Sequence, residues 1–430
     1  MTKIDSKLIY NLLISNNILE YLNISEKKEF SSCCKFIYEK CTGIRLKNLK
    51  FCGLEFQAYV DNTQKGKNWG HESYKLKVEY FETIINKRKN ILTSLVYGGS
   101  DYLLIEHFSL KFVNLNSLLL DYITIPKNIL KNIIKNLVNL RSLLLWGISV
   151  AYSKNDFQVS DFKFSKYLRE LRWDTCKQLE LDSTDYLKIL KYRSIRRSAR
   201  ESILDISLNL INSLNYLDWQ PMGSDDNQIF NEIITNNPGL TTLSSTLNCF
   251  NSASFKYIST NSNLTKLIIS NCGDFLSLNS IHLCKLPNIK ILEFQEILGE
   301  ISDSLDLLIE NCPNLEELKL PYFYECDQYI INYINNLTKL KVLTININDY
   351  TLSFLDSVLL QSNLEKLEID SISPIKFNFN NFANMKNLKH INNMHMHIKS
   401  NSKYQIPEYE ELNDWRMISY PTSTQYWKIK

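Results

Sequence analysis

One leucine pattern, Leu-x-x-Leu-x-Leu, returns at a nearly constant distance along most of this chain. The stretch Asn314-Leu315-Glu-Glu-Leu318-Lys-Leu320 shows it in full. Its first apolar residue, called the leading residue below, occurs at Leu92, Leu115, Leu140, Leu168, Leu187, Leu214, Leu240, Leu264, Ile289, Leu315, Leu340, Leu364 and Leu388. From Leu92 to Leu388 these positions span 296 residues in twelve steps, a period of about 25. Such a chain is expected to fold as stacked copies of one small unit.

The spacing within one unit predicts a short strand. Leu318 and Leu320 are two residues apart, so they share one face of a strand, while Glu317 and Lys319 share the other. One strand cannot bury its apolar face alone, and a helix is expected behind each. Helical spacing joins Ile301, Leu305, Leu308 and Ile309, with Ser302 or Asp303 suited to the helix start and Asn311-Cys-Pro313 to its end.

A second helix is predicted from Ile129, Leu130, Ile133, Ile134 and Leu137, with Pro126 in its first turn. Stacking such units gives an inner parallel sheet and an outer layer of helices. We therefore predict an α/β fold of the leucine-rich-repeat type, a horseshoe-shaped solenoid. Eight residues after the leading residue, the turn carries Asn or Cys in several units, namely at Cys176, Asn248, Cys272 and Asn348.

The repeat does not cover the whole chain, and three segments are expected. Residues 1–43 predict a small all-α segment, residues 44–398 the solenoid, and residues 399–430 a C-terminal cap. Within the cap, Trp415 to Tyr420 and Gln425 to Ile429 flank Pro421-Thr-Ser-Thr, which predicts a hairpin closing the open end of the solenoid.

Charge and cysteine content limit the partners and the compartment. A formal net charge of +3 over 430 residues gives no reason to expect nucleic acid or membrane as a partner. No secretion signal and no run of eighteen apolar residues is found. The ten cysteines are interpreted as reduced, partly because several occupy positions expected to be buried, namely Cys176, Cys249, Cys272, Cys284 and Cys312. We expect a cytoplasmic protein. A nuclear location is the alternative, because a basic cluster occurs at Lys188, Lys191, Arg193, Arg196, Arg197 and Arg200.

Motifs of catalysis and cofactor binding are missing from the sequence. It contains no Gly-x-Gly-x-x-Gly, phosphate-binding loop, Cys-x-x-Cys or His-Glu-x-x-His. His390, His395 and His397 are the only metal-like grouping, without an evident carboxylate to orient them, and we interpret them as surface histidines. The expectation is a non-catalytic chain with no cofactor and no metal.

The N-terminal segment resembles the F-box. The resemblance rests on Ile18-Leu-Glu-Tyr-Leu22, Ser25, Phe30-Ser-Ser-Cys-Cys34-Lys35 and Tyr38, whereas the Leu-Pro pair that opens many F-boxes has no counterpart at Tyr10-Asn11. With the repeats, it implies an F-box and leucine-rich-repeat protein of the ribonuclease-inhibitor-like kind. Such a protein is the substrate-recognition subunit of an SCF-type ubiquitin ligase and binds a Skp-family adaptor and, through it, a cullin. The adaptor-binding residues so implied are Leu19, Leu22, Phe30 and Cys34. A helical cap for the first repeat is the alternative.

The target protein is expected on the strand face, where residues other than the leucines line up between units. The most interface-like set lies in four successive units and comprises Trp146, Arg172, Arg193 and Tyr216. Mixed charges also keep an exposed sheet soluble, and composition alone does not separate the two interpretations. Two rival functions remain open: an adaptor-free scaffold, and an inhibitor-like or GTPase-regulator-like repeat protein.

Overall fold

The computed structural model of the chain describes residues 48–52, 78–79, 82–83, 85–86, 89–98, 102–153, 162–181, 184, 200–203, 211–221, 227–270, 283–295, 303–321, 327–347, 362–371, 379–382, 385–395, 414–420 and 423–429. The chain divides into two compact units, Met1–Ser213 and Leu214–Lys430, called unit 1 and unit 2. The segment 1–43, with the F-box-like residues, lies outside the described residues.

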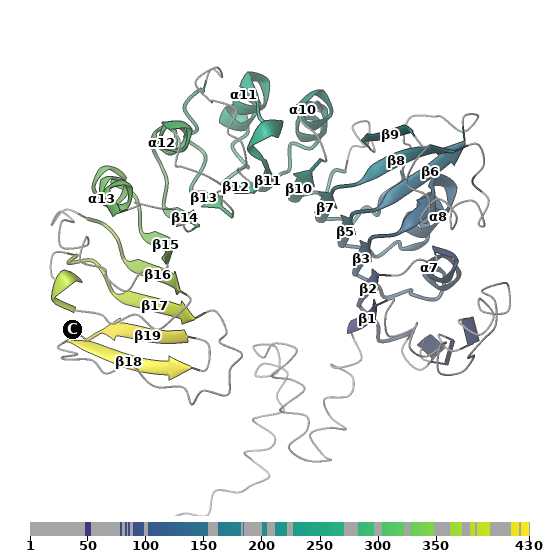
Figure 1. Ribbon diagram of the computed structural model, residues 1–430, viewed down its shortest axis with the longest axis horizontal. Helices are drawn as coiled ribbons and strands as arrows, with labels where there is room; N and C mark the ends of the chain where they lie inside the picture. The colour runs from purple at the N-terminus through teal and green to yellow at the C-terminus, as the bar shows by residue number, and fades with distance from the viewer. Residues whose placement is uncertain are drawn as a thin grey trace, which may run out of the picture. The chain divides into compact units, whose positions relative to one another are not determined.

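Unit 1 contains a parallel sheet in the order β1-β2-β3-β5-β7. Its strands are β1 (Asn48–Cys52), β2 (Ser94–Gly98), β3 (Ser117–Asp121), β5 (Ser142–Trp146) and β7 (Glu170–Asp174). Helices α7 (Tyr102–Ser109) and α8 (Lys127–Asn136) lie behind this sheet (Figure 1). A second sheet of unit 1 has the order β4-β6-β8-β9, formed by β4 (Thr124–Pro126), β6 (Ser149–Ser153), β8 (Lys177–Leu181) and β9 (Arg200–Ile203).

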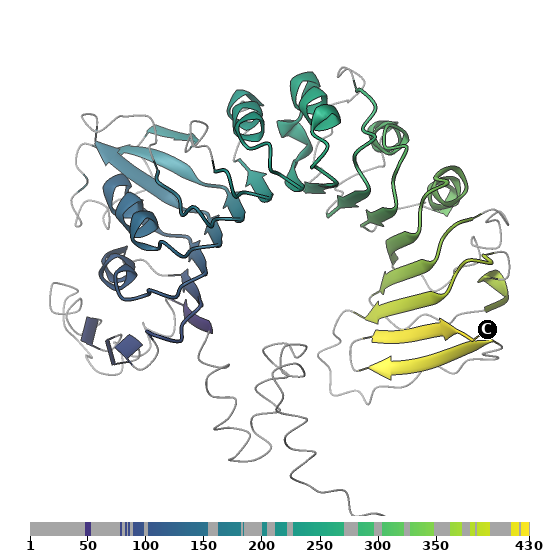
Figure 2. The ribbon, with the colours of Figure 1, turned by 180° about the vertical axis from the view of Figure 1, so that it is seen from behind.

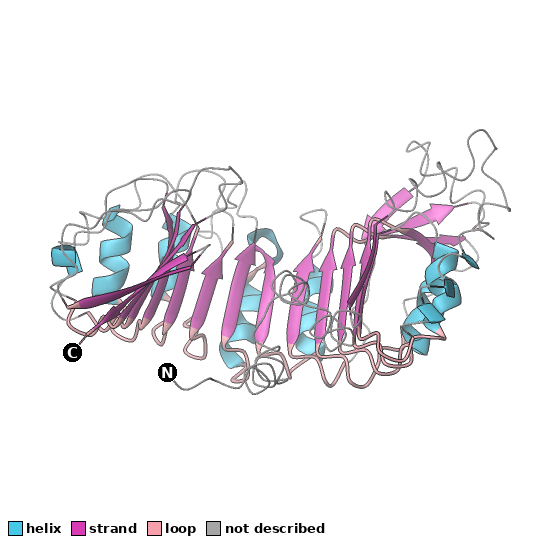
Figure 3. Ribbon diagram, turned by 90° about the horizontal axis from the view of Figure 1, so that it is seen from below, coloured by secondary structure: helices cyan, strands magenta, loops and turns pink. Residues whose placement is uncertain are grey.

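The described residues of unit 2 include eight parallel strands and a terminal antiparallel pair, in the order β10 to β17, then β19 and β18. They are β10 (Tyr216–Gln220), β11 (Thr242–Thr246), β12 (Lys266–Ser270), β13 (Ile291–Phe294), β14 (Glu317–Leu320), β15 (Val342–Ile347), β16 (Lys366–Ser371), β17 (His390–His395), β18 (Trp415–Tyr420) and β19 (Ser423–Lys428). One side carries α10 (Asn227–Asn236), α11 (Ser252–Thr260), α12 (Asp303–Glu310), α13 (Asp327–Asn336) and the short η2 (Leu247–Cys249) and η5 (Phe379–Phe382). The strands lie side by side with these helices behind them (Figures 2 and 3). This architecture fits a leucine-rich-repeat solenoid.

The periodic residues form the core of both units. The twelve described leading residues are each at most 1% exposed, and Leu187 lies outside the described residues. The residue three positions later is equally buried in each of these repeats, as Leu292, Leu318 and Leu343 show on adjacent strands. Burial of this row on every strand holds each repeat against its neighbours.

Polar bonds join each repeat to the one before it. At most steps, the two amide groups after the leading residue donate to one carbonyl of the preceding repeat; Arg141 and Ser142, for example, both donate to the carbonyl of Asn116. An asparagine just before the leading residue adds a side-chain bond. In six repeats the Nδ2 of this asparagine donates to a backbone carbonyl of the preceding repeat, namely that of the residue two positions before its leading residue. The six donors are Asn114, Asn139, Asn263, Asn314, Asn363 and Asn387. We call this set, together with Asn288, the asparagine ladder.

A left-handed residue links the two sheets of unit 1. Tyr122, Gly147 and Thr175 each lie seven residues after a leading residue and have φ angles of 48°, 60° and 49°. Each follows the last residue of an inner strand and comes two residues before an outer strand begins. The intervening residue is apolar or cysteine and is buried, as at Ile148 and Cys176. The same bend therefore occurs in three successive repeats of unit 1, and we call it the corner.

Replacing Gly147 by Ala is expected to lower the free energy of unfolding by about 1–3 kcal/mol. A φ of 60° is costly for a residue with a Cβ, and that Cβ would lie 2.8 Å from ring carbons of Tyr122. Urea unfolding followed by circular dichroism measures the loss. The matched change Thr175→Gly removes a β-branched residue from the same conformation and should leave stability equal or higher. The opposite order of the two variants would contradict a left-handed corner.

Two expectations about the fold need correction, and others are confirmed. The outer layer of unit 1 was expected to be helical, but it includes the β4-β6-β8-β9 sheet because the corner returns the chain to an extended conformation. Pro126 precedes α8 as its N-cap instead of lying in the first turn. The expected helix at 303–310 is confirmed as α12, and the expected C-terminal hairpin as β18 and β19.

Candidate functional site

On the strand face of unit 1, apolar side chains line up across neighbouring strands. Val96, Leu119 and Leu144 are aligned by the register of β2, β3 and β5, and each is half-buried. The next residue in this row is Arg172 on β7, whose side chain is exposed. Because adjacent strands are about 4.8 Å apart, the three aliphatic residues form a continuous apolar row.

Two aromatic rings extend this row at the end of the strands. Trp146 ends β5 and is 46% exposed, and Tyr122 stands at the corner after β3 and is 59% exposed. Their ring centroids are 5.6 Å apart at an interplanar angle of 46°. Gly147 lies directly against the Tyr122 ring. Val96, Leu119, Leu144, Tyr122 and Trp146 are called the unit 1 patch below.

Polar groups border the unit 1 patch. Ser142 Oγ donates to Glu170 Oε2 at 2.7 Å, and Arg172 Nε donates to Glu170 Oε1 at 2.9 Å. Trp146 is flanked in register by Asp121 on β3 and Asp174 on β7. Asp121 Oδ1 is buried and accepts no hydrogen bond from the described part of the chain. The patch thus has an apolar centre with polar and charged groups at its edge, which is the arrangement typical of protein interfaces.

The strand face of unit 2 carries matched charges instead. Glu293 Oε2 lies 3.0 Å from Lys266 Nζ, and Glu293 Oε1 lies 3.2 Å from Lys319 Nζ. Burial alone would raise the pKa of Glu293, but the two lysines outweigh it and hold this pKa below its ordinary value. Among the described residues of unit 2, the exposed large hydrophobic side chains are Trp427 and Ile429, neither on β10 to β17. The two strand faces therefore differ in chemistry.

A second charge pattern in unit 2 is formed by the residues that come directly after the leading residues. It alternates in sign over five repeats as Lys290, Glu316, Lys341, Glu365 and Lys389. Glu316 pairs with both neighbouring lysines, at 3.2 Å and 2.8 Å, and Lys389 pairs with Glu365 at 2.8 Å. Hydrogen bonds to the lysines lower the pKa values of Glu316 and Glu365. Each exposed ion pair of this kind contributes little to stability. Because these lysines and glutamates pair with one another, few of them are left to pair with charges of a partner protein.

The histidines and cysteines show no metal site or disulfide in the part of the chain that the structure describes. His390 stacks on Trp427 with ring centroids 3.9 Å apart, and burial, followed by the charge of Lys366, lowers its pKa. The His395 side chain and His397 lie outside the described residues. Cys176, Cys249 and Cys312 are buried as expected, Cys284 is only half-buried, and Cys272 lies outside the described residues. Burial raises the pKa of the Cys176 thiol and raises that of Cys312 to about 12. Both thiols are therefore protonated and unreactive.

The structure brings together part of the site predicted from the sequence. Trp146 and Arg172 lie on adjacent strands, offset by two residues in register. Tyr216 begins β10 in unit 2, and Arg193 lies outside the described residues, as do Leu19, Leu22, Phe30 and Cys34. The sequence analysis missed Tyr122, because nothing in the repeat pattern places that position at an exposed corner.

No family model matches the chain, and no curated protein matches it. Among solved structures, a TLR13–ssRNA13 complex is similar, with 19% identity and a TM-score of 0.42 over 70% of this chain and 39% of that one. The yeast Rad7 and Elc1 complex matches with 15% identity and a TM-score of 0.30 over 85% and 93%. A leucine-rich-repeat protein of Leptospira interrogans matches with 15% identity and a TM-score of 0.23 over 71% and 84%. The chain thus spans well under half the length of the first of these.

None of the described helices is both long and apolar enough to cross a bilayer.

Proposed function

We propose that the chain is a non-catalytic protein-interaction module and that the unit 1 patch binds its partner protein. The observation that carries this proposal is the pair of exposed rings, Tyr122 and Trp146, in contact beside a half-buried apolar row. Exposed tryptophan and tyrosine side chains at the centre of a patch are typical anchors of protein interfaces. Arg172, which borders the patch, is proposed as a further contact with this partner, and Arg193 and Tyr216 stay candidate contacts predicted from the sequence.

A preformed anchor lowers the entropic cost of binding. The backbone of Trp146 is held in the register of a parallel sheet, and the Tyr122 ring, at the corner, contacts the Trp146 ring. Little side-chain ordering is then required when a partner covers the two rings. Ser142 and Arg172 already form hydrogen bonds with Glu170 along one border of the patch. Because these groups are paired without a partner, we expect them to contribute more to specificity than to affinity.

Trp146→Ala should weaken partner capture by on the order of 2 kcal/mol or more, with little change in melting temperature. Removal of an exposed anchor ring loses contact area with the partner but opens no cavity in the core. Partners identified by proximity labelling of the intact chain would supply the ligand for titration by calorimetry.

Lys366→Ala is the control, because Lys366 is the first residue of β16 in unit 2, on the side of that strand that is not buried, and is paired with Glu368 at 2.5 Å. It should leave capture unchanged. Retention of all partners by Trp146→Ala together with their loss in Lys366→Ala would move the site to unit 2.

At a finer level, we propose that the partner is a target presented to an SCF-type ubiquitin ligase. This proposal rests on the F-box-like residues, with Leu19, Leu22, Phe30 and Cys34 as contacts to a Skp-family adaptor that connects to a cullin. The adaptor-free scaffold and the inhibitor-like or GTPase-regulator-like protein are the alternatives, and both would use the same patch without an adaptor.

Co-purification with a Skp-family adaptor distinguishes these functions. The full chain should retain the adaptor, whereas a truncated chain that begins at Ile44 should lose it and still capture the target. In the full chain, the pair Leu19→Asp and Leu22→Asp should have the same effect as truncation, because charges would replace the apolar contacts. If the full chain captures its target but never the adaptor, the scaffold function takes the place of the ligase function.

A further inference from the structure

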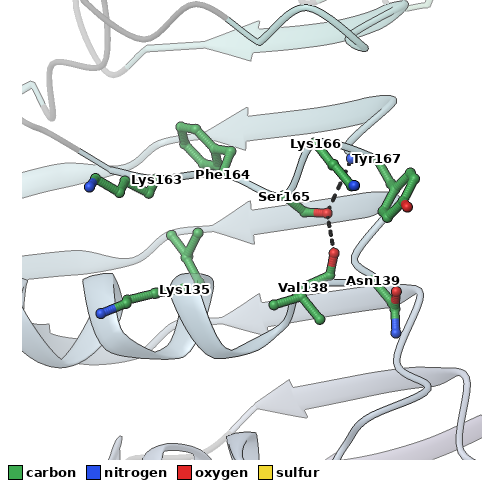
Figure 4. A pocket seen from close by; sticks show the side chains of 9 residues that line it. Lys135, Val138, Asn139, Lys163, Phe164, Ser165, Lys166 and Tyr167 are labelled. Atoms are coloured by element: carbon green, nitrogen blue, oxygen red, sulfur yellow. Dashed lines mark hydrogen bonds between the residues drawn. The ribbon is translucent and has the colours of Figure 1, made fainter.

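A cleft of about 480 Å³ opens on the turn edge of unit 1, away from the residues of the unit 1 patch. It lies between the C-terminal end of α8 and the segment 163–167 that leads to β7 (Figure 4). Ile134, Val138, Phe164 and Tyr167 supply its apolar lining. This volume is within the range of ligand-binding clefts, about 300–1,000 Å³.

The apolar surface at this edge is unusually exposed. Val138 is 61% exposed and Tyr167 is 46% exposed, although both are large hydrophobic residues. Leu110 and Val113, on the neighbouring repeat, are exposed as well, and Asn139 Nδ2 donates to the Val113 carbonyl at 2.8 Å, so the two repeats touch here. Four exposed apolar residues thus occur over three successive repeats, two of them around the cleft, and exposed apolar surface of this kind is typical of an interaction surface.

The charged lining of the cleft is entirely positive. Lys135, Lys163 and Lys166 line it, no carboxylate does, and none of the three forms an ion pair with a described residue. Lys166 Nζ lies 5.0 Å from the Tyr167 ring centroid. This contrasts with the strand face of unit 2, where lysines and glutamates alternate and pair. The three ammonium groups give the cleft a positive potential that a negatively charged ligand would match.

The polar groups on the cleft wall already satisfy one another. Ser165 Oγ donates to the Val138 carbonyl at 2.6 Å, and the Tyr167 amide donates to Ser165 Oγ at 3.2 Å (Figure 4). These bonds hold the segment 163–167 against the end of α8. The wall therefore offers a ligand two kinds of contact, which are apolar surface inside the cleft and ammonium groups around it.

We propose that this cleft binds an acidic peptide segment of another protein, with one bulky apolar side chain of that segment inserted between Val138 and Tyr167. Carboxylates on either side of the inserted residue face Lys135, Lys163 and Lys166. An anionic membrane would also suit lysines beside apolar residues, but the recess favours an inserted side chain: Ile134, at its floor, is 2% exposed and out of reach of a flat surface. The inference is independent of the unit 1 patch.

Synthetic fluorescent peptides test this inference on the full chain. Each peptide carries Glu and Asp on both sides of one central residue, which is Phe, Trp, Leu or Ala. Fluorescence anisotropy should show at least about tenfold tighter binding of one of the first three peptides than of the Ala peptide, and binding should weaken as salt is added. A peptide with Lys in place of the acidic residues should not bind.

Variants assign the binding to the cleft. The pair Lys163→Glu and Lys166→Glu should weaken the best peptide at least about tenfold, and Lys163→Arg with Lys166→Arg should restore it because the charge is kept. Lys256→Glu with Lys386→Glu changes the net charge equally at exposed positions of unit 2 and should leave affinity unchanged, as should Trp146→Ala. Circular dichroism checks that each variant is folded.

Three results would overturn the inference. The first is equal affinity for all four acidic peptides, or none for any of them. The second is an equal loss in the cleft and control pairs, which would mean that only net charge matters. The third is sedimentation of the chain with phosphatidylserine vesicles that depends on Val138, Lys163 and Lys166 while no peptide binds, which would assign the edge to a membrane.

Discussion

Replacing Leu318 by Ala is expected to lower the free energy of unfolding by about 2–5 kcal/mol. Leu318 on β14 is fully buried and lies in register between Leu292 and Leu343, which are also fully buried. Truncation removes contacts with both neighbouring repeats at once, and the strands on either side prevent collapse of the cavity. Urea unfolding of the full chain, followed by circular dichroism, measures the loss.

Lys319→Ala is the control, because Lys319 is the next residue on the same strand and its side chain is exposed. It should cost much less, since Glu293 keeps its ion pair with Lys266 when Lys319 is removed. Equal losses in the two variants would mean that the two faces of β14 have been exchanged.

The second large effect is expected at Asn288, in the asparagine ladder. The carbonyl oxygens of Ile258, Asn261 and Leu264 lie 2.8, 2.9 and 2.8 Å from Asn288 Nδ2, and they share the two N–H groups of this amide. Asn288→Ala leaves these acceptors without the amide and should cost about 1–3 kcal/mol. Asn288→Asp should cost more, because a carboxylate would face three carbonyl oxygens with no proton between them.

Asn263 provides the matched position for this test. Its Nδ2 makes one exposed bond, to the Pro238 carbonyl at 3.2 Å, so Asn263→Ala should cost about 0.5–1.5 kcal/mol. Calorimetric melting of the four proteins, including the wild type, gives the order. If Asn288→Asp melts at the same temperature as Asn288→Ala, or above it, the amide does not donate as described.

The period and the buried face of the repeats could be predicted from the sequence, because they depend on one residue type at fixed spacing. Leu292, Leu318 and Leu343 are the same residue type at the same position of the repeat, and all are buried, so their spacing alone identifies them as core residues. The corner could not be predicted in this way. Its left-handed position is Tyr122, Gly147 or Thr175, and only the glycine suggests such a conformation. Packing of the second sheet imposes the bend on the other two.

The asparagine ladder did leave a signal that the sequence analysis overlooked. Asparagine is scarce at the turn eight residues after the leading residue, but it stands just before the leading residue in seven repeats. Asn114, Asn139 and Asn288 are examples. The candidate site was foreseen only in part: Trp146 and Arg172 could be placed by alternation along a strand, but Tyr122 and the cleft depend on how the chain leaves each strand.

The asparagine ladder also determines how a chain of this kind can change during evolution. Each such repeat carries both the donor, one residue before its leading residue, and the acceptor carbonyl, two residues before it, so duplication or loss of a whole repeat leaves every remaining bond possible. Within each period of about 25 residues, the ladder and the buried row constrain only a handful of side chains, and the others can drift. Descendants of a common ancestor are then expected to differ in repeat number and in most residues. They would be recognised by aligning ladder positions repeat by repeat, not by identity along the whole chain.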